Sequence, residues 1–368
     1  MQLSETVKLY MTKEQKMLIV ATMKEYVCTV NHLVSMAVKG TSISKYTTAD
    51  IDANLPSAIA NQCIRDAKSI VAKYNKEVRK AGTEVKEKKV TVPVLKKPCC
   101  YINNQNFKLN GNAIKFPVCI DGKSKRISVE TAMTDRQKQL FANGKLGTMR
   151  IVFKGNKIVA QIVYEVIEEV YSDKGTAMGI DLGIKCPAVS YNADGSVKFY
   201  GNGRKNKYMR RRYQHLRRKL QKEKHIDALE KINNKEQRIM KDIDHKISHD
   251  IIETAVAHDV KLIKLEQLSN IRSATRTSRK NNHSLHNWSF YRLAQYIEYK
   301  AKLAGIRVEY VNPAYTSQRC PVCGHVHHAN DRKYTCTCGY HIHRDLLGAM
   351  NICNSTEYVG DSNIRHTA

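Results

Sequence analysis

One apolar stretch constrains this chain more than any other: it runs from Met178 to Ser190 and holds a single carboxylate, Asp181. An isolated ionised carboxylate in an apolar strand takes up a proton unless a cation lies beside it. Gly179 and Gly183 flank the acid, and a glycine within a strand marks a close approach by another backbone or a ligand. We expect a buried strand with a metal ion at Asp181, although a strand-end Asp that hydrogen-bonds to a neighbouring loop fits this stretch equally well.

Two other carboxylates occupy similar settings later in the chain. Glu266 is the one acid in the short apolar run 262–268, and Asp345 stands at the start of a short helical segment, 343–352. Taken singly, Glu266 would be a strand-end charge and Asp345 a helix N-cap. In nucleases of the RNase H type, however, carboxylates from two strands and a later helix hold two divalent ions. The three acids in this order therefore favour a site of that kind.

The charge balance indicates a polyanionic partner. Lys and Arg number 62 against 34 Asp and Glu, a formal charge of +28, and nucleic acid is the first candidate for so basic a chain. A membrane surface is the rival, but apolar runs such as 17–21 are too short to span a bilayer, and the N-terminus lacks a signal-peptide pattern. Eleven scattered cysteines fit a reducing compartment, so we expect a cytoplasmic protein.

Local signals divide the first half of the chain into helices and strands. Residues 2–10 alternate as a strand, and helical patterns fill most of 11–88, one starting at Thr12 and another running from Leu55 to about Arg79. From Lys89 onward, tight-turn pairs at 110–111, 121–122 and 155–156 separate β-rich runs. With 368 residues and 42% hydrophobic content, the chain has room for two or three domains. We predict a small barrel that the N-terminal strand completes, with the helices inserted.

A basic amphipathic helix is predicted from Arg204 to Lys224, which carries eleven Lys or Arg and one acid. The usual interpretation of such a run is a solvated face, but beside a nuclease-like site phosphate contact is favoured. No proline occurs between Pro187 and Pro313, which allows a long helical hairpin from about 206 to 259, before the run that holds Glu266. A later helix containing Trp288 and Tyr299 is also predicted. The candidate phosphate-binding residues are Arg210, Arg211, Arg212, Arg217, Arg218 and Lys219, with Arg272 and Arg276 in a later polar loop.

Four cysteines form the most specific local motif. Cys320-Pro-Val-Cys323 is followed, after twelve residues, by Cys336-Thr-Cys338, and a glycine follows each pair. Paired knuckles of this kind fit a closed, structural, tetrahedral zinc site. The second pair has one spacer residue instead of two, so His341 or His343 stays open as a replacement ligand.

Taken together, these segments resemble one family over nearly the whole chain: the TnpB proteins of insertion sequences, RNA-guided nucleases related to compact type V CRISPR effectors. The matching stretches are 179–183, 263–272, 315–324, and Arg344-Asp345 with Ala349 and Asn351-Ile352. One difference is that Leu347-Gly348 stands where family members have Asn-Ala.

The resemblance implies an α+β multidomain fold with a split RuvC domain, which is RNase H-like. Asp181, Glu266 and Asp345 would be the metal-binding catalytic acids, holding two Mg2+ ions that Mn2+ could replace, and the knuckle would hold one structural Zn2+. The implied parts are 1–10, first strand of a wedge β-barrel; 11–88, helical recognition lobe; 89–170, rest of the barrel; 171–352, nuclease domain with a zinc insertion at about 316–341; and 353–368, C-terminal tail.

The function that follows is an RNA-guided DNA endonuclease that cuts next to a short transposon-associated motif, in the cytoplasm of a bacterial or archaeal cell. Its expected partners are a guide RNA from the transposon end, a double-stranded DNA target and the displaced single strand. Two alternatives remain: a nuclease-inactive RNA-guided DNA-binding protein, which would not need the three acids, and a transposase of RNase H fold, although no separate helix-turn-helix domain is readable.

Overall fold

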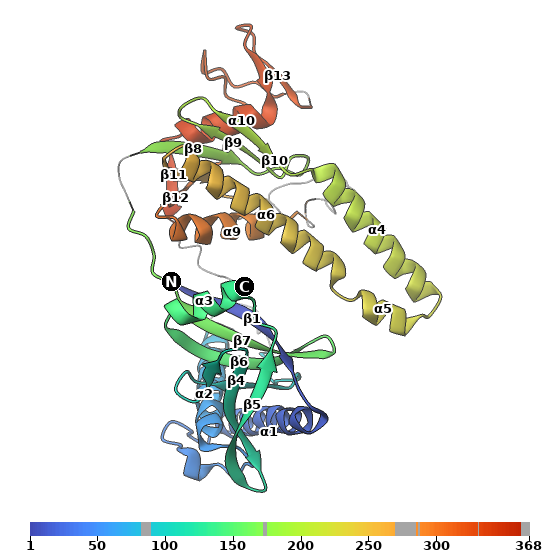
Figure 1. Ribbon diagram of the computed structural model, residues 1–368. Coiled ribbons are helices and arrows are strands. Elements are labelled where there is room, and N and C mark those ends of the chain that lie inside the picture. The colour runs from blue at the N-terminus through green and yellow to red at the C-terminus, as the bar shows by residue number, and fades with distance from the viewer. Residues whose placement is uncertain (82–89, 172–174, 269–284, 286–287, 330, 362–368) are drawn as a thin grey trace. The chain divides into compact units, whose positions relative to one another are not determined.

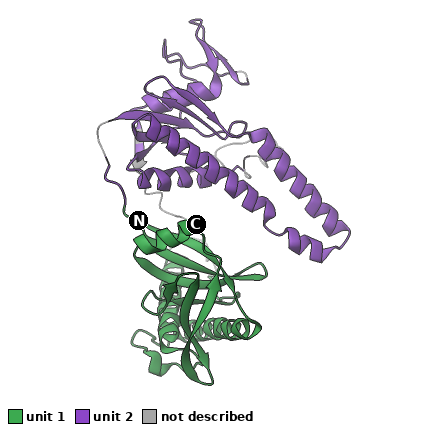
Figure 2. Ribbon diagram, in the orientation of Figure 1, with its two compact units in different colours: residues 1–167 green, residues 168–368 purple. Residues whose placement is uncertain are grey.

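The computed structural model describes residues 1–81, 90–171, 175–268, 285, 288–329 and 331–361. The chain forms two compact units, Met1–Ile167 and Glu168–Ala368 (Figure 2). Each unit has its own hydrophobic core. None of the described helices is both long enough and apolar enough to cross a bilayer.

The first unit is built on a seven-stranded sheet in the order β2-β6-β7-β1-β5-β4-β3 (Figure 1). Every pairing is antiparallel, and the predicted tight turns join β3 to β4, β4 to β5 and β6 to β7. β1 pairs with β7 along most of its length and with β5 at Leu9 and Tyr10. The strands are β1 Gln2–Tyr10, β2 Cys99–Ile102, β3 Lys108–Asn110, β4 Ala113–Ile120, β5 Lys123–Thr131, β6 Leu146–Lys154 and β7 Lys157–Glu165.

The predicted barrel is found as an open, curled sheet, because the described residues contain no pairing between the edge strands β2 and β3. Between β1 and β2 the chain forms α1 Lys13–Val38, the 3-10 turn η1 Thr48–Asp50 and α2 Ser57–Ala81, as the helical patterns predicted. Thr12 and Gln15 cap the start of α1 reciprocally. Apolar faces of α1 and α2 pack with the sheet into one core. A short helix, α3 Asp135–Asn143, joins β5 to β6.

The second unit has a mixed six-stranded sheet in the order β10-β9-β8-β11-β12-β15. At its centre β8, β11 and β12 run parallel, whereas β9, β10 and β15 pair antiparallel with their neighbours. The strands are β8 Thr176–Asp181, β9 Ala188–Asn192, β10 Val197–Tyr200, β11 Val260–Glu266, β12 Arg307–Val311 and β15 Tyr358–Asp361. The strand β15 lies within the segment that the sequence suggested to be a tail.

Helices cover both faces of this sheet (Figure 1). α6 and α9 pack on the face that carries Met178, Ile180, Ile263 and Leu265. α10 Arg344–Asn354 packs on the other face. The predicted helical hairpin is α4 Gly203–Lys222, a short α5 Ile226–Ile232, and α6 Lys235–Ala257. The helix predicted around Trp288 is α9 Phe290–Leu303, so the prediction was wrong at this residue: Trp288 precedes the helix.

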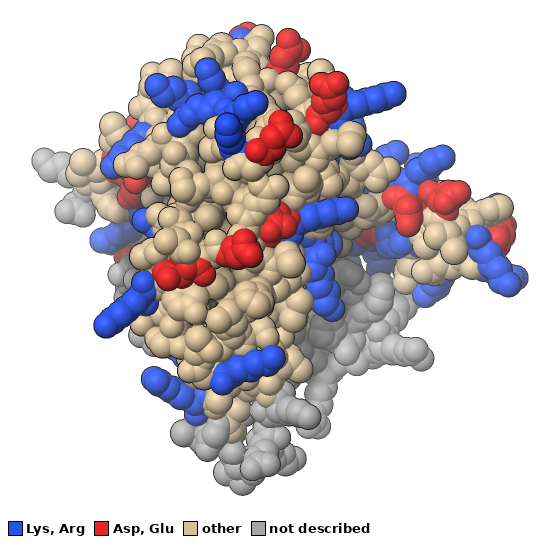
Figure 3. Space-filling model, turned by 90° about the horizontal axis from the view of Figure 1, so that it is seen from below, with Lys and Arg blue, Asp and Glu red and all other residues tan. Residues whose placement is uncertain are grey.

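Charge is mixed on the face that Figure 3 shows. Lys and Arg side chains gather there in several groups, and Asp and Glu side chains lie among them. Among the described residues this face shows no continuous basic patch, although the whole chain has a formal charge of +28.

Close backbone packing holds α10 on the sheet. A Cβ atom added at Gly179 of β8 would lie 2.2 Å from the carbonyl oxygen of Ala349 and 2.3 Å from the backbone nitrogen of Cys353. From the neighbouring strand, Lys264 donates to the carbonyl oxygens of Cys353 and Ser355, at 2.9 and 2.8 Å. A glycine is thus required at 179, and the lysine satisfies carbonyl groups at the end of the helix.

We predict that Gly179→Ala destabilises the second unit by about 3 kcal/mol or more, because the contact is with backbone atoms that have no flexible end to give way. As a comparison, Gly195→Ala has open space around it but a φ of +89°, so only the left-handed backbone costs energy there, about 1 kcal/mol. Chemical denaturation of both variants measures the difference. Equal losses would show that α10 does not rest on Gly179 as described.

Candidate active site and cysteine cluster

The three predicted acids meet at one place in the second unit. Asp181 and Glu266 are the last residues of β8 and β11, which pair in parallel up to Ile180 and Leu265. Because the carboxyl ends of parallel neighbours meet at the same edge, the two acids lie next to each other and point to the face that α10 covers. Asp345 is in the first turn of α10.

Helix α10 approaches this edge closely at Gly348. A Cβ atom at that position would lie 3.2 Å from Cγ of Asp181 and 3.3 Å from its Oδ2. One of the two residues at which the sequence departs from the TnpB pattern therefore leaves little space for a side chain beside the first acid. A larger side chain here would need Asp181 or the helix to shift.

Burial raises the pKa of two of these acids, Asp181 and Glu266. Burial raises the pKa of Asp181 well above its usual range, and the charges of Glu266 and Asp345 raise it further. Burial also raises the pKa of Glu266 against the opposing effect of a hydrogen bond from Thr316. In the described part of the chain no hydrogen bond reaches the Asp181 carboxylate, so it lacks a compensating donor.

Two residues that the sequence analysis did not single out, Thr316 and Arg332, lie around the acids. The hydroxyl of Thr316 donates to Glu266, and the guanidinium of Arg332 donates to Asp345. The cation Arg344 partly offsets the raised pKa of both Asp181 and Glu266. Arg332 lies between the two cysteine pairs, where an arginine looks like an ordinary surface charge, so only the fold indicates its position.

The donor set at this edge fits Mg2+. Three carboxylates offer the oxygen ligands that this ion prefers, and a divalent cation would offset the charges that raise the pKa of Asp181. The three carboxylates lie further apart than the ligands of a single ion would. This spacing fits a site for two ions, because such a site is wider. For Asp345 to bind ions with both carboxylate oxygens, the hydrogen bond from Arg332 to this carboxylate would have to break.

The four cysteines form a compact cluster. Their sulfur atoms all lie within 4.8 Å of one another. Among the described residues, no other group of three or more possible metal ligands is gathered this closely. The distances are 3.7 Å for Cys320–Cys338 and 3.5 Å for Cys323–Cys336, close to the roughly 3.8 Å that a tetrahedral ion with bonds of about 2.3 Å requires. The backbone N–H of Cys338 lowers the pKa of Cys336 to about 6, which favours a thiolate ligand.

Neither histidine left open by the sequence belongs to this cluster. His343 accepts a hydrogen bond from the backbone N–H of Asp345 at 3.3 Å and caps α10, and His341 lies near the carbonyl oxygen of Gly339, at 3.4 Å. Both belong to the second strand of a small hairpin, β13 Lys333–Thr335 and β14 His341–His343. The four cysteines therefore suffice as a zinc ligand set.

The basic helix α4 carries two kinds of cations. Arg217 pairs with Glu236 of α6 at 2.6 Å, and Arg210 reaches the same carboxylate at 4.0 Å, so both help to hold the helical hairpin together. The exposed cations among the predicted contacts are Arg211, Arg212, Arg218 and Lys219, the last paired with Glu223 at 3.9 Å. Arg272 and Arg276 lie outside the described residues.

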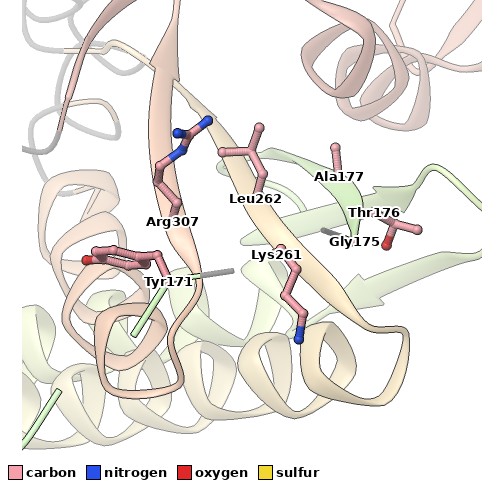
Figure 4. Close-up of a pocket in the computed structure, with 7 residues that line it drawn as sticks. All are labelled: Tyr171, Gly175, Thr176, Ala177, Lys261, Leu262 and Arg307. Atoms are coloured by element: carbon pink, nitrogen blue, oxygen red, sulfur yellow. The ribbon is translucent and has the colours of Figure 1, made fainter. Parts of the chain in front are cut away.

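A small pocket of about 140 Å³ lies at the opposite end of the strands (Figure 4). It is lined by Thr176 and Lys261 near the starts of β8 and β11, and by Arg307 at the start of β12. Both cations already pair with acids, Lys261 with Asp259 and Arg307 with Glu309. We assign it no part in the site.

Comparison with known proteins finds similar families and relatives. A family model described as "Probable transposase" matches residues 161–272, and one described as "Cas12f1-like, TNB domain" matches 290–352. The TnpB-like protein MJ0751 of Methanocaldococcus jannaschii is 31% identical over 269 residues, which are 69% of this chain and 94% of that protein. A Cas12f1 endodeoxyribonuclease of Syntrophomonas palmitatica is 25% identical over 83% of this chain and 67% of its own.

A solved structure of a Cas12f1–sgRNA–target DNA complex shares the fold, with a TM-score of 0.68 at 16% identity over 94% of this chain and 84% of that one. This chain therefore shares its fold with the Cas12f1 protein of that complex. The chain belongs to the TnpB-like family.

We predict that Asp181→Asn raises the melting temperature at neutral pH without divalent ions. A raised carboxyl pKa means that the folded state binds more protons than the unfolded state, so stability is lost as pH rises from the usual Asp pKa through the raised one. Asn removes the charge at similar volume, and a gain of about 3 °C or more is expected.

Asp194→Asn tests the opposite sign. The backbone N–H of Ser196 lowers the pKa of Asp194 to about 2, which contributes stability at neutral pH that falls away only in acid. This variant should melt lower than the wild type. A lower melting temperature for Asp181→Asn as well would show that the Asp181 charge does not destabilise the folded protein.

We predict about one zinc per purified chain, which elemental analysis measures. Cys320→Ser should lose this zinc and make the segment from 316 to 343 sensitive to protease, because zinc binding contributes folding energy directly. Cys28→Ser is the matched control, since Cys28 is an exposed free cysteine in α1. Folded protein that contains no zinc would argue against the ligand assignment.

Proposed function

We propose that this protein is an RNA-guided, Mg2+-dependent DNA endonuclease with a single RuvC-type active site. The observation that carries the proposal is the meeting of Asp181, Glu266 and Asp345 at one edge of the sheet in a TnpB-like chain. Its formal charge of +28 suits nucleic-acid partners. Members of the related Cas12f1 group are named endodeoxyribonucleases, which supports a nuclease.

Different structural elements would position the three carboxylates. Two Mg2+ ions held by the three carboxylates would supply an activated water and stabilise the leaving oxygen. Asp181 and Glu266 would hold their positions through the paired strands, and Thr316 orients the Glu266 carboxylate. Asp345 would be positioned by α10, whose start is capped by His343. Arg332, beside Asp345, would then face a bound phosphate.

The finer organisation is proposed with it. Residues 1–10 and 89–170 would form the wedge, 11–88 the recognition lobe that reads a short motif next to the target, and 171–352 the nuclease domain with its zinc insertion at about 316–341. The partners would be a guide RNA from the transposon end and a double-stranded DNA target, whose displaced strand the protein also meets. Base pairing with the guide would supply most of the sequence specificity.

A transposase is the second candidate, because one matching family model is described as a probable transposase. A strand-transferring transposase would use the same three acids, so these do not separate the two functions. Products do: a guided nuclease leaves cut target DNA, whereas a transposase leaves joined strands. RNA that copurifies with the protein also separates them.

We predict that Asp181→Ala, Glu266→Ala and Asp345→Ala each abolish cutting of a DNA target matched to the copurified RNA, with losses of at least about a thousandfold. Because the acids share one ion site, two substitutions together should lose little more than one. RNA and target binding, measured by gel shift, should change less than about threefold.

Asp242→Ala is the matched control, an exposed acid on α6 that pairs with Lys246 and lies outside the proposed site. It should cut at the wild-type rate. A near wild-type rate for any of the three site variants, with Mg2+ present, would remove that residue from the site.

A further inference from the structure

A groove of about 620 Å³ lies in the second unit, and the loop that follows Asp181 forms part of its lining. One wall is α4, and another is the start of α9 with the residues just before it. Gly183 and Ile184, which follow Asp181 in the loop after β8, also line it. The start of α4 is fixed to the same loop, since the Gly203 N–H donates to the Lys185 carbonyl at 3.0 Å. The groove is therefore continuous with the segment that carries the first acid.

The groove has an excess of positive charge. Its two acids, Glu236 and Asp244, already pair with Arg217 and Arg292 at 2.6 Å each. Three exposed cations of α4 also line it, Lys207, Arg211 and Arg218. In the part of the chain that the structure describes, no acid pairs with these three, so they remain available to phosphate groups.

The groove also holds an aromatic side chain. Trp288, the single tryptophan of the chain, lines it and is partly buried. Its ring lies against Phe290, with 5.0 Å between centroids. Any of the four bases can stack on an aromatic ring, but only when the base is unpaired. Cations along one wall and a supported indole are the two parts of a single-strand site.

We propose that this groove binds single-stranded DNA and guides it to Asp181, with Arg211 and Arg218 on its phosphates and Trp288 stacked on a base. The volume is of the scale of sites for drug-sized ligands, which suits one or two nucleotides. The choice of DNA rests on the proposed function. The assignment separates the faces of α4: Arg211 and Arg218 line the groove, whereas their neighbours Arg212 and Lys219 do not.

Intrinsic fluorescence tests the groove directly, because Trp288 is the only tryptophan in the protein. The probe is a twelve-nucleotide thymidine oligomer, added to the full chain with its copurified RNA in EDTA, so that no cutting occurs. Binding should quench the tryptophan emission. By anisotropy of a labelled oligomer, Trp288→Ala should weaken binding by about five- to a hundredfold, and Trp288→Phe should keep most of the affinity.

A charge-matched pair of double variants separates the groove from general electrostatics. Arg211→Gln with Arg218→Gln should weaken binding about tenfold and reduce the log–log salt slope by about 1.4, two contacts at about 0.7 each. Arg212→Gln with Lys219→Gln removes the same charge from the same helix and should change affinity by less than about twofold. Thermal melting confirms that all variants are folded.

Three outcomes would overturn the proposal: oligomer binding without a change in emission, equal losses in the two double variants, or quenching by a duplex as strong as by the single strand. A single-stranded RNA that binds more tightly than DNA of the same sequence would assign the groove to RNA and also overturn it. These readouts need no cleavage. RNA-guided cutting without quenching of the tryptophan emission would contradict only the proposed role of the groove. Quenching without RNA-guided cutting would contradict only the proposed nuclease function.

Discussion

The constraint on which the second unit depends is the gathering of three negative charges at a buried sheet edge. Asp181 has no donor among the described residues, and burial with two neighbouring carboxylates raises its pKa. The surroundings compensate only in part, with a hydroxyl on Glu266 and a guanidinium on Asp345. Such an arrangement is costly without cations. Much of the surrounding fold holds these charges in place.

The cysteine cluster and the acids are mechanically connected. The residues between the two cysteine pairs supply Arg332 to Asp345, and Asp331 pairs with Lys185 in the loop after β8 at 2.8 Å. The second cysteine pair is followed by β14 and then directly by α10. A closed zinc site would therefore fix both the helix that bears the third acid and the arginine beside it, without itself taking part in chemistry.

Local patterns were enough to predict the turns, the strands that end at Asp181 and Glu266, the helix at Asp345 and the cysteine cluster, because each depends on residues close in sequence. Thr316 and Arg332 could not be found in this way, since their roles depend on packing between distant segments. Amphipathic spacing marked α4 as basic but could not distinguish Arg217, which pairs with Glu236 on another helix, from Arg211, which is exposed. That distinction needs the folded hairpin.

The order of the three acids along the chain affects when the proposed nuclease site could first form. Asp181 and Glu266 are on adjacent strands, but α10, which brings Asp345 and closes over Gly179, comes much later. Because a chain leaves the ribosome from its N-terminus at about 5–20 residues per second, a nascent chain holds the first two acids for several seconds before the third emerges. During that interval the unfinished protein would lack one acid of the proposed site, so the proposed nuclease could not yet cut DNA.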